Sequence, residues 1–170
     1  MNMPLFKKII DEAKDIGIEE ICLSFYNEPF LDKLLFQRIK YVKQKNMRVV
    51  FFSNGTLLDD SIINDILKYV PDIIYFSFDS YNKKDYERIR IGGNFEKTRS
   101  NILKLIKERN RLKMKKPFIQ VNLIHMNKND NELDEFIKYW NSKADAIDLG
   151  ALDNREEISK LKLKVKTKHG

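Results

Sequence analysis

Polar side chains that could bind a small molecule follow three apolar runs of the sequence. Glu28 follows the first run, Asn54 the second, and Ser77 and Asp79 the third. A carboxylate such as Glu28 accepts hydrogen bonds from an ammonium group, and the Asn54 amide is both donor and acceptor. The motifs recur every 25 or 26 residues, which fits a repeated strand-plus-helix unit. Because parallel strands of such a repeat end at one edge of the sheet, we expect the motifs to converge in space.

Two further residues could complete such a binding site. Arg90 follows the third motif and could reach over the end of the sheet to pair with a carboxylate or a phosphate. Asn122 lies inside an apolar run, where a buried amide needs either a core partner or a ligand. From position alone, a structural role in a turn, a helix cap or the core stays open for each of these residues.

Several kinds of chemistry are disfavoured by the sequence. Cys22 is the one cysteine, which excludes an intrachain disulfide and a metal site with several cysteines. We expect it to be a small buried apolar residue. His125 has no cysteine or second histidine at ligand spacing. Gly92-Gly93 lacks the remaining residues of a phosphate-binding loop. We therefore predict no metal ligand and no catalytic residue in this chain.

The apolar patterns predict the elements that position these residues. Alternating strands and helices indicate an α/β protein, with a parallel sheet of about five strands and helical crossovers in the order α(βα)4β. The pattern does not separate an open doubly wound sheet from part of a barrel. Asp59 or Asp60 is expected to cap the third helix. The predicted strands are 21–25, 49–52, 73–76, 118–124 and 146–149, and the helices are 5–16, 31–42, 62–70, 83–90, 95–106 and 133–140.

Composition is consistent with one folded domain. The chain has 170 residues, of which 42% are hydrophobic, and a net charge of +7. Residues 155–170 alone carry a charge of +4. We therefore divide the chain into a domain over residues 1–153 and a basic tail over residues 154–170. No apolar stretch is long enough to span a membrane, and no signal peptide is recognised, so we expect a cytoplasmic protein.

Taken together, the motifs resemble those of the radical SAM superfamily, whose members cleave S-adenosylmethionine with a 4Fe-4S cluster. Residues 26–31 resemble its Gly-Glu-Pro segment, 53–58 its Thr-Asn-Gly-Thr-Leu-Leu segment, and 77–79 its Ser-x-Asp segment. Residues 90–102 are similar to the Arg, Gly-Gly-x-Phe and Asn-Ile pattern that comes next, and 121–133 to the fifth strand and helix. The resemblance spans about residues 4–153 and is strongest to members that carry a SPASM extension.

The resemblance implies a partial (βα) barrel of the TIM type. Glu28 would accept the methionine ammonium of S-adenosylmethionine, and Ser77 and Arg90 would bind its carboxylate or ribose. Asn122 would contact the ribose, and Asn54 and Asp79 would line the cavity. The implied cofactor-binding residues are thus Glu28, Asn54, Ser77, Asp79, Arg90 and Asn122.

The chain departs from the family at its first strand and its cluster loop. Family members carry a C-x3-C-x2-C motif after that strand, and this sequence has neither the strand nor the three cysteines. The resemblance therefore implies a truncated core that is not competent alone. It would be a truncated product, a gene remnant or part of a split enzyme, with a missing N-terminal segment or a partner subunit supplying the rest. The substrate of such an enzyme would be a peptide or a small molecule.

Two other functions remain as alternatives. The chain could be a non-catalytic binding module that uses the strand ends, or its lysine-rich tail for nucleic acid, although a solvated tail is the commoner reading. It could also be an unrelated barrel enzyme with Glu28 and Asp79 as acid and base. Because the family's first strand is missing, the strand at residues 21–25 should be an exposed edge that favours self-association, unless a strand at 161–165 covers it.

Overall fold

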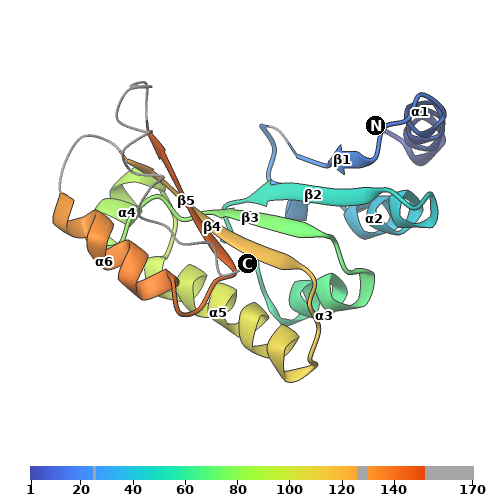
Figure 1. Cartoon of the computed structure of the whole chain (residues 1–170). Coiled ribbons are helices and arrows are strands. Elements are labelled where there is room, and N and C mark those ends of the chain that lie inside the picture. Colours follow the sequence, from blue (N-terminus) through green and yellow to red (C-terminus); the bar gives the residue numbers. More distant parts are fainter. Residues whose placement is uncertain (25, 126–129, 152–170) are drawn as a thin grey trace.

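Five parallel strands form one sheet in the computed structural model, and neighbours in sequence are neighbours in space (Figure 1). The structure describes residues 1–24, 26–125 and 130–151. The predicted parallel α/β fold is confirmed, and the sheet is not closed. The strands are β1 (Glu20–Cys22), β2 (Arg48–Ser53), β3 (Ile73–Ser77), β4 (Phe118–His125) and β5 (Ala146–Ala151).

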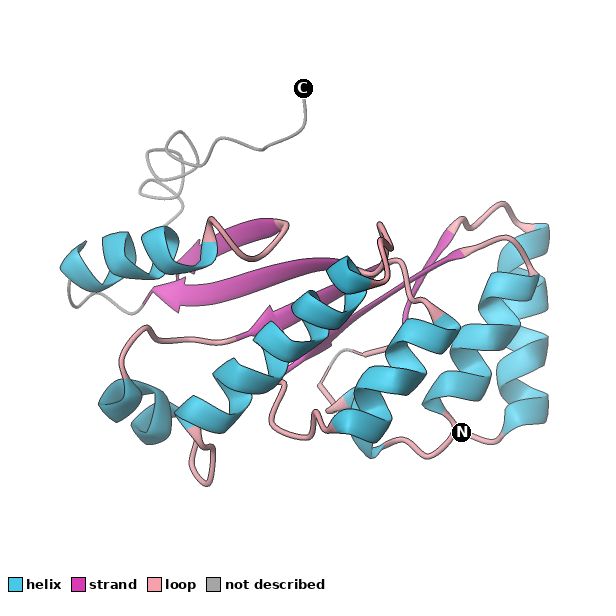
Figure 2. Cartoon of the chain, turned by 90° about the horizontal axis from the view of Figure 1, so that it is seen from below, coloured by secondary structure: helices cyan, strands magenta, loops and turns pink. Residues whose placement is uncertain are grey.

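Helices connect the strands and cover one face of the sheet. Figures 1 and 2 show α2, α3 and α5 lying side by side along this face. No helix among the described residues is long and apolar enough to cross a membrane. The helices are α1 (Met3–Asp15), α2 (Leu35–Gln44), α3 (Asp60–Tyr69), α4 (Lys83–Ile89), α5 (Phe95–Arg111) and α6 (Asp130–Trp140), with a 3₁₀ turn η1 (Pro29–Leu31) before α2.

Side-chain alternation along the strands separates a covered face from an uncovered one. Phe51 in β2 and Phe76 in β3 are fully buried under the helices, whereas their neighbours Phe52 and Tyr75 stack on the other face with ring centroids 4.5 Å apart. Phe52 keeps 43% of its surface exposed. The described residues therefore leave the second face of the sheet without a helical layer, as expected for part of a barrel wall.

Aromatic side chains form the part of the core under the carboxyl ends of β3 and β4. Phe78 follows β3 and contacts Tyr86 of α4, Phe95 of α5 and Trp140 of α6, with ring centroids 5.0 to 5.4 Å apart. All four side chains are buried. This cluster joins α4, α5 and α6 and fixes the segment that leaves β3.

Asp72 links the amino-terminal ends of the central strands through hydrogen bonds and ion pairs. Its side chain is 2% exposed and accepts hydrogen bonds from Lys43, from Lys116 and from the Val49 backbone N–H. Burial raises the pKa of Asp72, but the hydrogen bonds from Lys116 and Lys43 lower it, and the balance keeps the pKa below its ordinary value.

Some elements differ from the prediction. The first strand is shorter than the predicted residues 21–25. The predicted cap of the third helix is confirmed as Asp59, whose Oδ1 accepts from the Ile62 N–H. Cys22 was expected to be buried, which is wrong: it is exposed, and its Sγ donates to the Ser24 carbonyl over 2.9 Å. The basic tail and its candidate strand at 161–165 lie outside the described residues.

Candidate functional site

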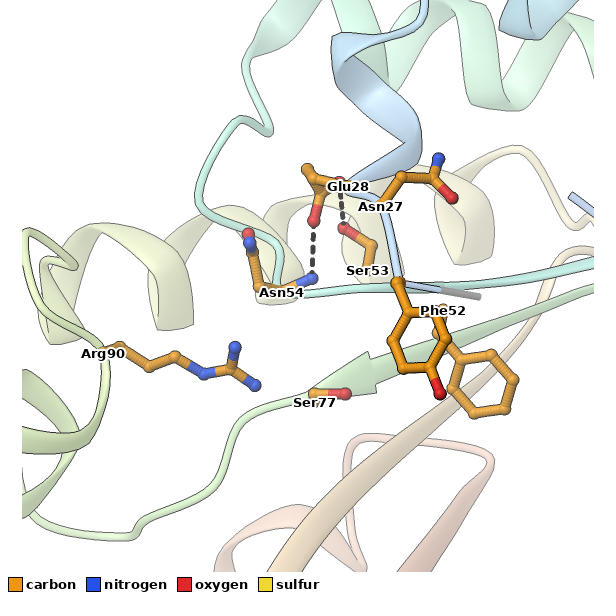
Figure 3. A pocket seen from close by; sticks show the side chains of 8 residues that line it. Asn27, Glu28, Phe52, Ser53, Asn54, Ser77 and Arg90 are labelled. Atoms are coloured by element: carbon orange, nitrogen blue, oxygen red, sulfur yellow. Dashed lines mark hydrogen bonds between the residues drawn. The ribbon is translucent and has the colours of Figure 1, made fainter. Parts of the chain in front are cut away.

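A cavity lies where β1, β2 and β3 end. Its volume is about 180 Å³, and Figure 3 shows the side chains around it. It contains four of the six residues predicted to bind a cofactor, so segments far apart in the sequence do converge here. The lining residues are Tyr26, Asn27, Glu28, Phe52, Ser53, Asn54, Ser77 and Arg90.

Glu28 is held rigidly at one side of the cavity. It caps the 3₁₀ turn η1, where its Oε1 accepts from the Phe30 N–H over 3.3 Å. The same oxygen accepts from the Ser53 hydroxyl over 2.8 Å, and Oε2 accepts from the Asn54 N–H over 2.9 Å. These bonds connect the 3₁₀ turn that follows β1 to the end of β2. An oxygen with a single donor keeps a lone pair for another hydrogen bond, so Oε2 can accept from a ligand.

Asn54 and Gly55 form the turn that follows β2. The Asn54 side-chain oxygen accepts from the backbone N–H and the hydroxyl of Thr56, over 2.9 and 2.6 Å. The amide N–H groups of Asn54 are then left as donors. Gly55 has φ of +71°, and a Cβ there would lie 3.3 Å from Ile102, Phe76 and Thr98. The turn needs glycine because that φ disfavours other residues and the core below is already filled.

Arg90 lies across the cavity from Glu28, and its guanidinium group points inward between Asn54 and Ser77 (Figure 3). Ser77 is the last residue of β3 and also lines the cavity. A carboxylate and a guanidinium on opposite sides of one cavity match the two charged ends of a zwitterion. The arrangement can bind an α-amino acid group through its ammonium and its carboxylate.

Asp79 and Asn122 are near the cavity but are not among its lining residues. Asp79 lies beyond the end of β3 and forms an ion pair with Arg90. Asn122 is the register partner of Ser77 in β4, and its side-chain oxygen accepts from Gln120 over 2.9 Å. Asp79 therefore reaches the site through Arg90, and Asn122 borders it through Ser77.

The family assignment follows from the sequence. The profile of the radical SAM superfamily matches residues 2–139. The chain belongs to the radical SAM superfamily. The cofactor-modifying protein for the tungsten-containing aldehyde ferredoxin oxidoreductase of Pyrococcus furiosus is 28% identical over 144 residues. An uncharacterised protein of Methanocaldococcus jannaschii is 29% identical over 145 residues.

The matched region is only part of these relatives. It covers 82% of this chain but 39% of the Pyrococcus protein, and 84% of this chain but 48% of the Methanocaldococcus protein. The chain thus corresponds to less than half the length of either relative.

Solved radical SAM structures share the fold. SuiB of Streptococcus suis, also crystallised with S-adenosylmethionine, superposes with a TM-score of 0.68 at 16% identity, over 96% of this chain and 36% of SuiB. Archaeal TYW1 superposes with a TM-score of 0.63 at 21% identity, over 93% of this chain and 57% of TYW1. At these identities the comparison establishes the arrangement of strands and helices, and the site has to be argued from this chain's own residues.

The residues of this radical SAM chain fit one of the two family cofactors. The opposed charges of Glu28 and Arg90 suit the methionine end of S-adenosylmethionine. A 4Fe-4S cluster needs several thiolates, whereas the sequence has the single Cys22. Among the described residues, no three His, Cys, Asp or Glu side chains are grouped to hold a metal ion. The residues present do not fit a cluster.

Four lining residues were not predicted from the sequence. Ser53 could have been found, because it precedes Asn54 in the same motif and its hydroxyl bonds to Glu28. Phe52 could not, since residues 49–52 are uniformly apolar and give no indication of which side faces the cavity. Tyr26 and Asn27 belong to the first motif, where only the carboxylate suggested chemistry.

Proposed function

We propose that this chain is the S-adenosylmethionine-binding part of a radical SAM enzyme. Glu28 accepts hydrogen bonds from the methionine ammonium, and Arg90 pairs with the methionine carboxylate. One observation carries the proposal: these two opposite charges line one cavity at the carboxyl ends of the strands. That edge is where ligands of parallel α/β folds bind.

The other residues of the site complete the binding surface. Ser77 and the Asn54 amide supply neutral hydrogen bonds beside the charged groups, and Asn122 supports Ser77 from β4 and contacts the ribose. Asn54 also presents the backbone N–H that fixes Glu28. When bound in a complete enzyme of this family, S-adenosylmethionine supplies a radical for hydrogen abstraction after reductive cleavage.

This chain alone is not competent in that reaction. Its single cysteine cannot supply the thiolates of the cluster, so these would come from residues outside this sequence or from a partner subunit. The substrate would be a peptide or a small molecule. This is supported by the cofactor-modifying name of the Pyrococcus relative and by the SuiB structure with its precursor peptide SuiA. A cytoplasmic location is part of the same proposal.

The test is calorimetry of S-adenosylmethionine with the wild-type chain and with Glu28→Gln. Glutamine keeps the shape but loses the charge, and we expect binding at least about tenfold weaker, since a charged hydrogen bond contributes about 1.5–3 kcal/mol. Glu12→Gln is the matched control, because Glu12 pairs with Lys8 on the exposed side of α1. Equal affinity of wild type and Glu28→Gln, with both folded by circular dichroism, would overturn the proposal.

A further inference from the structure

The segment after β3 turns away from the strand direction at Asp79. Asp79 has φ of +46°, in the left-handed region, and the next N–H, of Ser80, donates back to the Phe78 carbonyl over 2.6 Å. A non-glycine residue rarely has this conformation, although aspartate tolerates it better than most. The tight turn buries the Asp79 side chain, which is 6% exposed. Such local strain persists where the surrounding structure requires it, often at functional sites.

The buried Asp79 carboxylate has one ion pair and one unused oxygen. Its Oδ2 pairs with the Arg90 Nη2. Among the described residues, Asp79 Oδ1 and Arg90 Nε are both buried without a hydrogen-bond partner. Unsatisfied buried polar atoms are uncommon and costly. This contact is therefore poorly explained as a device for stability, because a stabilising pair would satisfy more of its atoms.

The backbone of Arg90 is fixed independently of its side chain. Its N–H donates to the Tyr86 carbonyl over 2.7 Å, and its carbonyl accepts from the Gly93 N–H over 2.8 Å. A Cβ on Gly93 would lie 2.9 Å from the Arg90 carbonyl and 3.1 Å from the Tyr86 ring. With the backbone held by α4 and Gly93, the direction of the guanidinium depends on what its nitrogens contact. Asp79 is its one ion-pair partner among the described residues.

We propose that Asp79 is a positioning residue, which fixes the Arg90 guanidinium so that it recognises the α-carboxylate of the ligand. The inference rests on the proposed function, which pairs Arg90 with the methionine carboxylate. It extends that function by assigning Asp79 to Arg90 rather than to the cavity lining.

The arrangement of donors on Arg90 explains why it would recognise a carboxylate rather than a ribose. A guanidinium has five N–H donors in a rigid plane. Asp79 engages Nη2, and Nε is buried, so Nη1 and the second N–H of Nη2 remain as donors for the ligand. Glu28 stands opposite with a free lone pair for an ammonium. An α-amino acid group presents its two charges a few bonds apart and fits between them. A ribose carries no charge and would gain little from a fixed cation.

The test compares two probes that differ in the carboxylate alone. The probes are S-adenosylmethionine and its decarboxylated form, titrated into wild type, Asp79→Asn and the control Glu108→Gln. Glu108 pairs with Arg111 over 2.8 Å on the exposed side of α5. We expect Asp79→Asn to weaken S-adenosylmethionine binding about tenfold, because a guanidinium that is no longer fixed loses rotamer entropy on binding. The decarboxylated probe should change less than about twofold, and Glu108→Gln should change neither.

Different results overturn different claims. If the wild type binds S-adenosylmethionine and Asp79→Asn weakens both probes equally, or neither, the positioning role is wrong while the proposed function stands. If the wild type binds neither probe, the proposed function fails, and this inference fails with it.

A second measurement does not depend on the variant folding. In ligand-free wild type, the Arg90 Nε–Hε resonance should be resolved and slow to exchange with solvent, because Nε is buried and the group is fixed. S-adenosylmethionine should shift it more than the decarboxylated probe does. A resonance in fast exchange with solvent, or one shifted equally by both probes, would overturn the positioning role.

Discussion

The Asp72 carboxylate shows how one buried charge connects the strands away from the site. It binds two lysines and a backbone N–H at the amino-terminal ends of β2, β3 and β4. In a parallel α/β fold the opposite end carries the ligand site, so residues at this end serve stability. Removing one partner of a buried ion pair leaves a charge without compensation and costs about 3–5 kcal/mol.

Asp72 should make stability depend on pH in the acid range. Its pKa is lower in the folded chain than in the unfolded chain, so its contribution is fully present above the unfolded pKa. It is lost as pH falls below the ordinary aspartate pKa of about 3.9 and then through the lower folded pKa. We expect Asp72→Asn to lower the unfolding free energy by about 3 kcal/mol at neutral pH and to flatten this part of the profile.

Urea denaturation of wild type and Asp72→Asn across that range measures both effects. Asp32→Asn is the control, because Asp32 pairs with Arg38 at a partly exposed position. Parallel pH profiles for wild type and Asp72→Asn would contradict the expectation.

The sequence predicted that some of the site residues converge in space, but it did not predict where Asp79 lies. Glu28 and Asn54 could be brought together because each follows a strand of a repeated unit. Asp79 could not be placed, because strand alternation puts it on the same face as Ser77, whereas β3 ends at Ser77 and the chain turns at Asp79. A positive φ at aspartate leaves no pattern in a single sequence. The contact with Arg90 therefore emerged only from the structure.

At the scale of elements, β1 is one of the two edge strands of the sheet, and β5 is the other. β1 pairs with β2 alone among the described residues. The Leu23 N–H donates to the Val50 carbonyl over 2.9 Å, so by alternation the Cys22 N–H points away from β2. Unpaired N–H and C=O groups at such an edge can recruit another strand.

We expect the chain to self-associate through this edge. Light scattering of the wild type should show association that rises with concentration. Cys22→Pro should reduce it, because proline removes an outward donor without breaking the pairing with β2. Cys22→Ser is the control: it removes the exposed thiol but keeps the N–H, so it should associate like the wild type under reducing conditions. A monomeric wild type with strong hydrogen-exchange protection at residues 20–22 would contradict this expectation.

Most elements could be predicted because their apolar patterns are long. The helix at 95–111 has apolar residues at helical spacing over several turns. The strands before and after it in the sequence, β3 and β4, start shortly after Pro71 and directly after Pro117. The short ones were harder. β1 extends over three residues, too few for a period, and the segment after Glu28 forms a 3₁₀ turn before α2 where a single helix was predicted. Tertiary contacts determine both, including the hydrogen bonds of Glu28 itself.

At the scale of the whole molecule, the described residues form an open wall with one uncovered face. The sequence resemblance correctly indicated a partial barrel, whereas the alternation of strands and helices indicated only a parallel sheet with helical crossovers. It could not give the width of the opening or the residues at the edge of the sheet. These depend on how far each strand extends, and a single sequence does not encode that in its pattern.

The single cysteine of the whole chain leads to an expectation about iron loading. Anaerobic reconstitution with iron and sulfide should leave this chain well below one 4Fe-4S cluster per molecule, because it has one cysteine. Cys22→Ser should retain the same residual iron, since that iron would not be bound by the thiol. Iron assays and chromatography for 5′-deoxyadenosine provide the measurement. Stoichiometric iron together with 5′-deoxyadenosine formation would contradict the proposal that this chain is not competent alone.

The aromatic cluster beneath the carboxyl ends of β3 and β4 contains an intrinsic fluorophore. Trp140 is the one tryptophan of the sequence, it is fully buried, and its ring lies 5.4 Å from that of Phe78. Phe78 is the residue directly before Asp79. A shift of the segment that carries Asp79 would change the packing around this single fluorophore. Its emission spectrum can therefore report movement at the Arg90 side of the cavity in unlabelled protein.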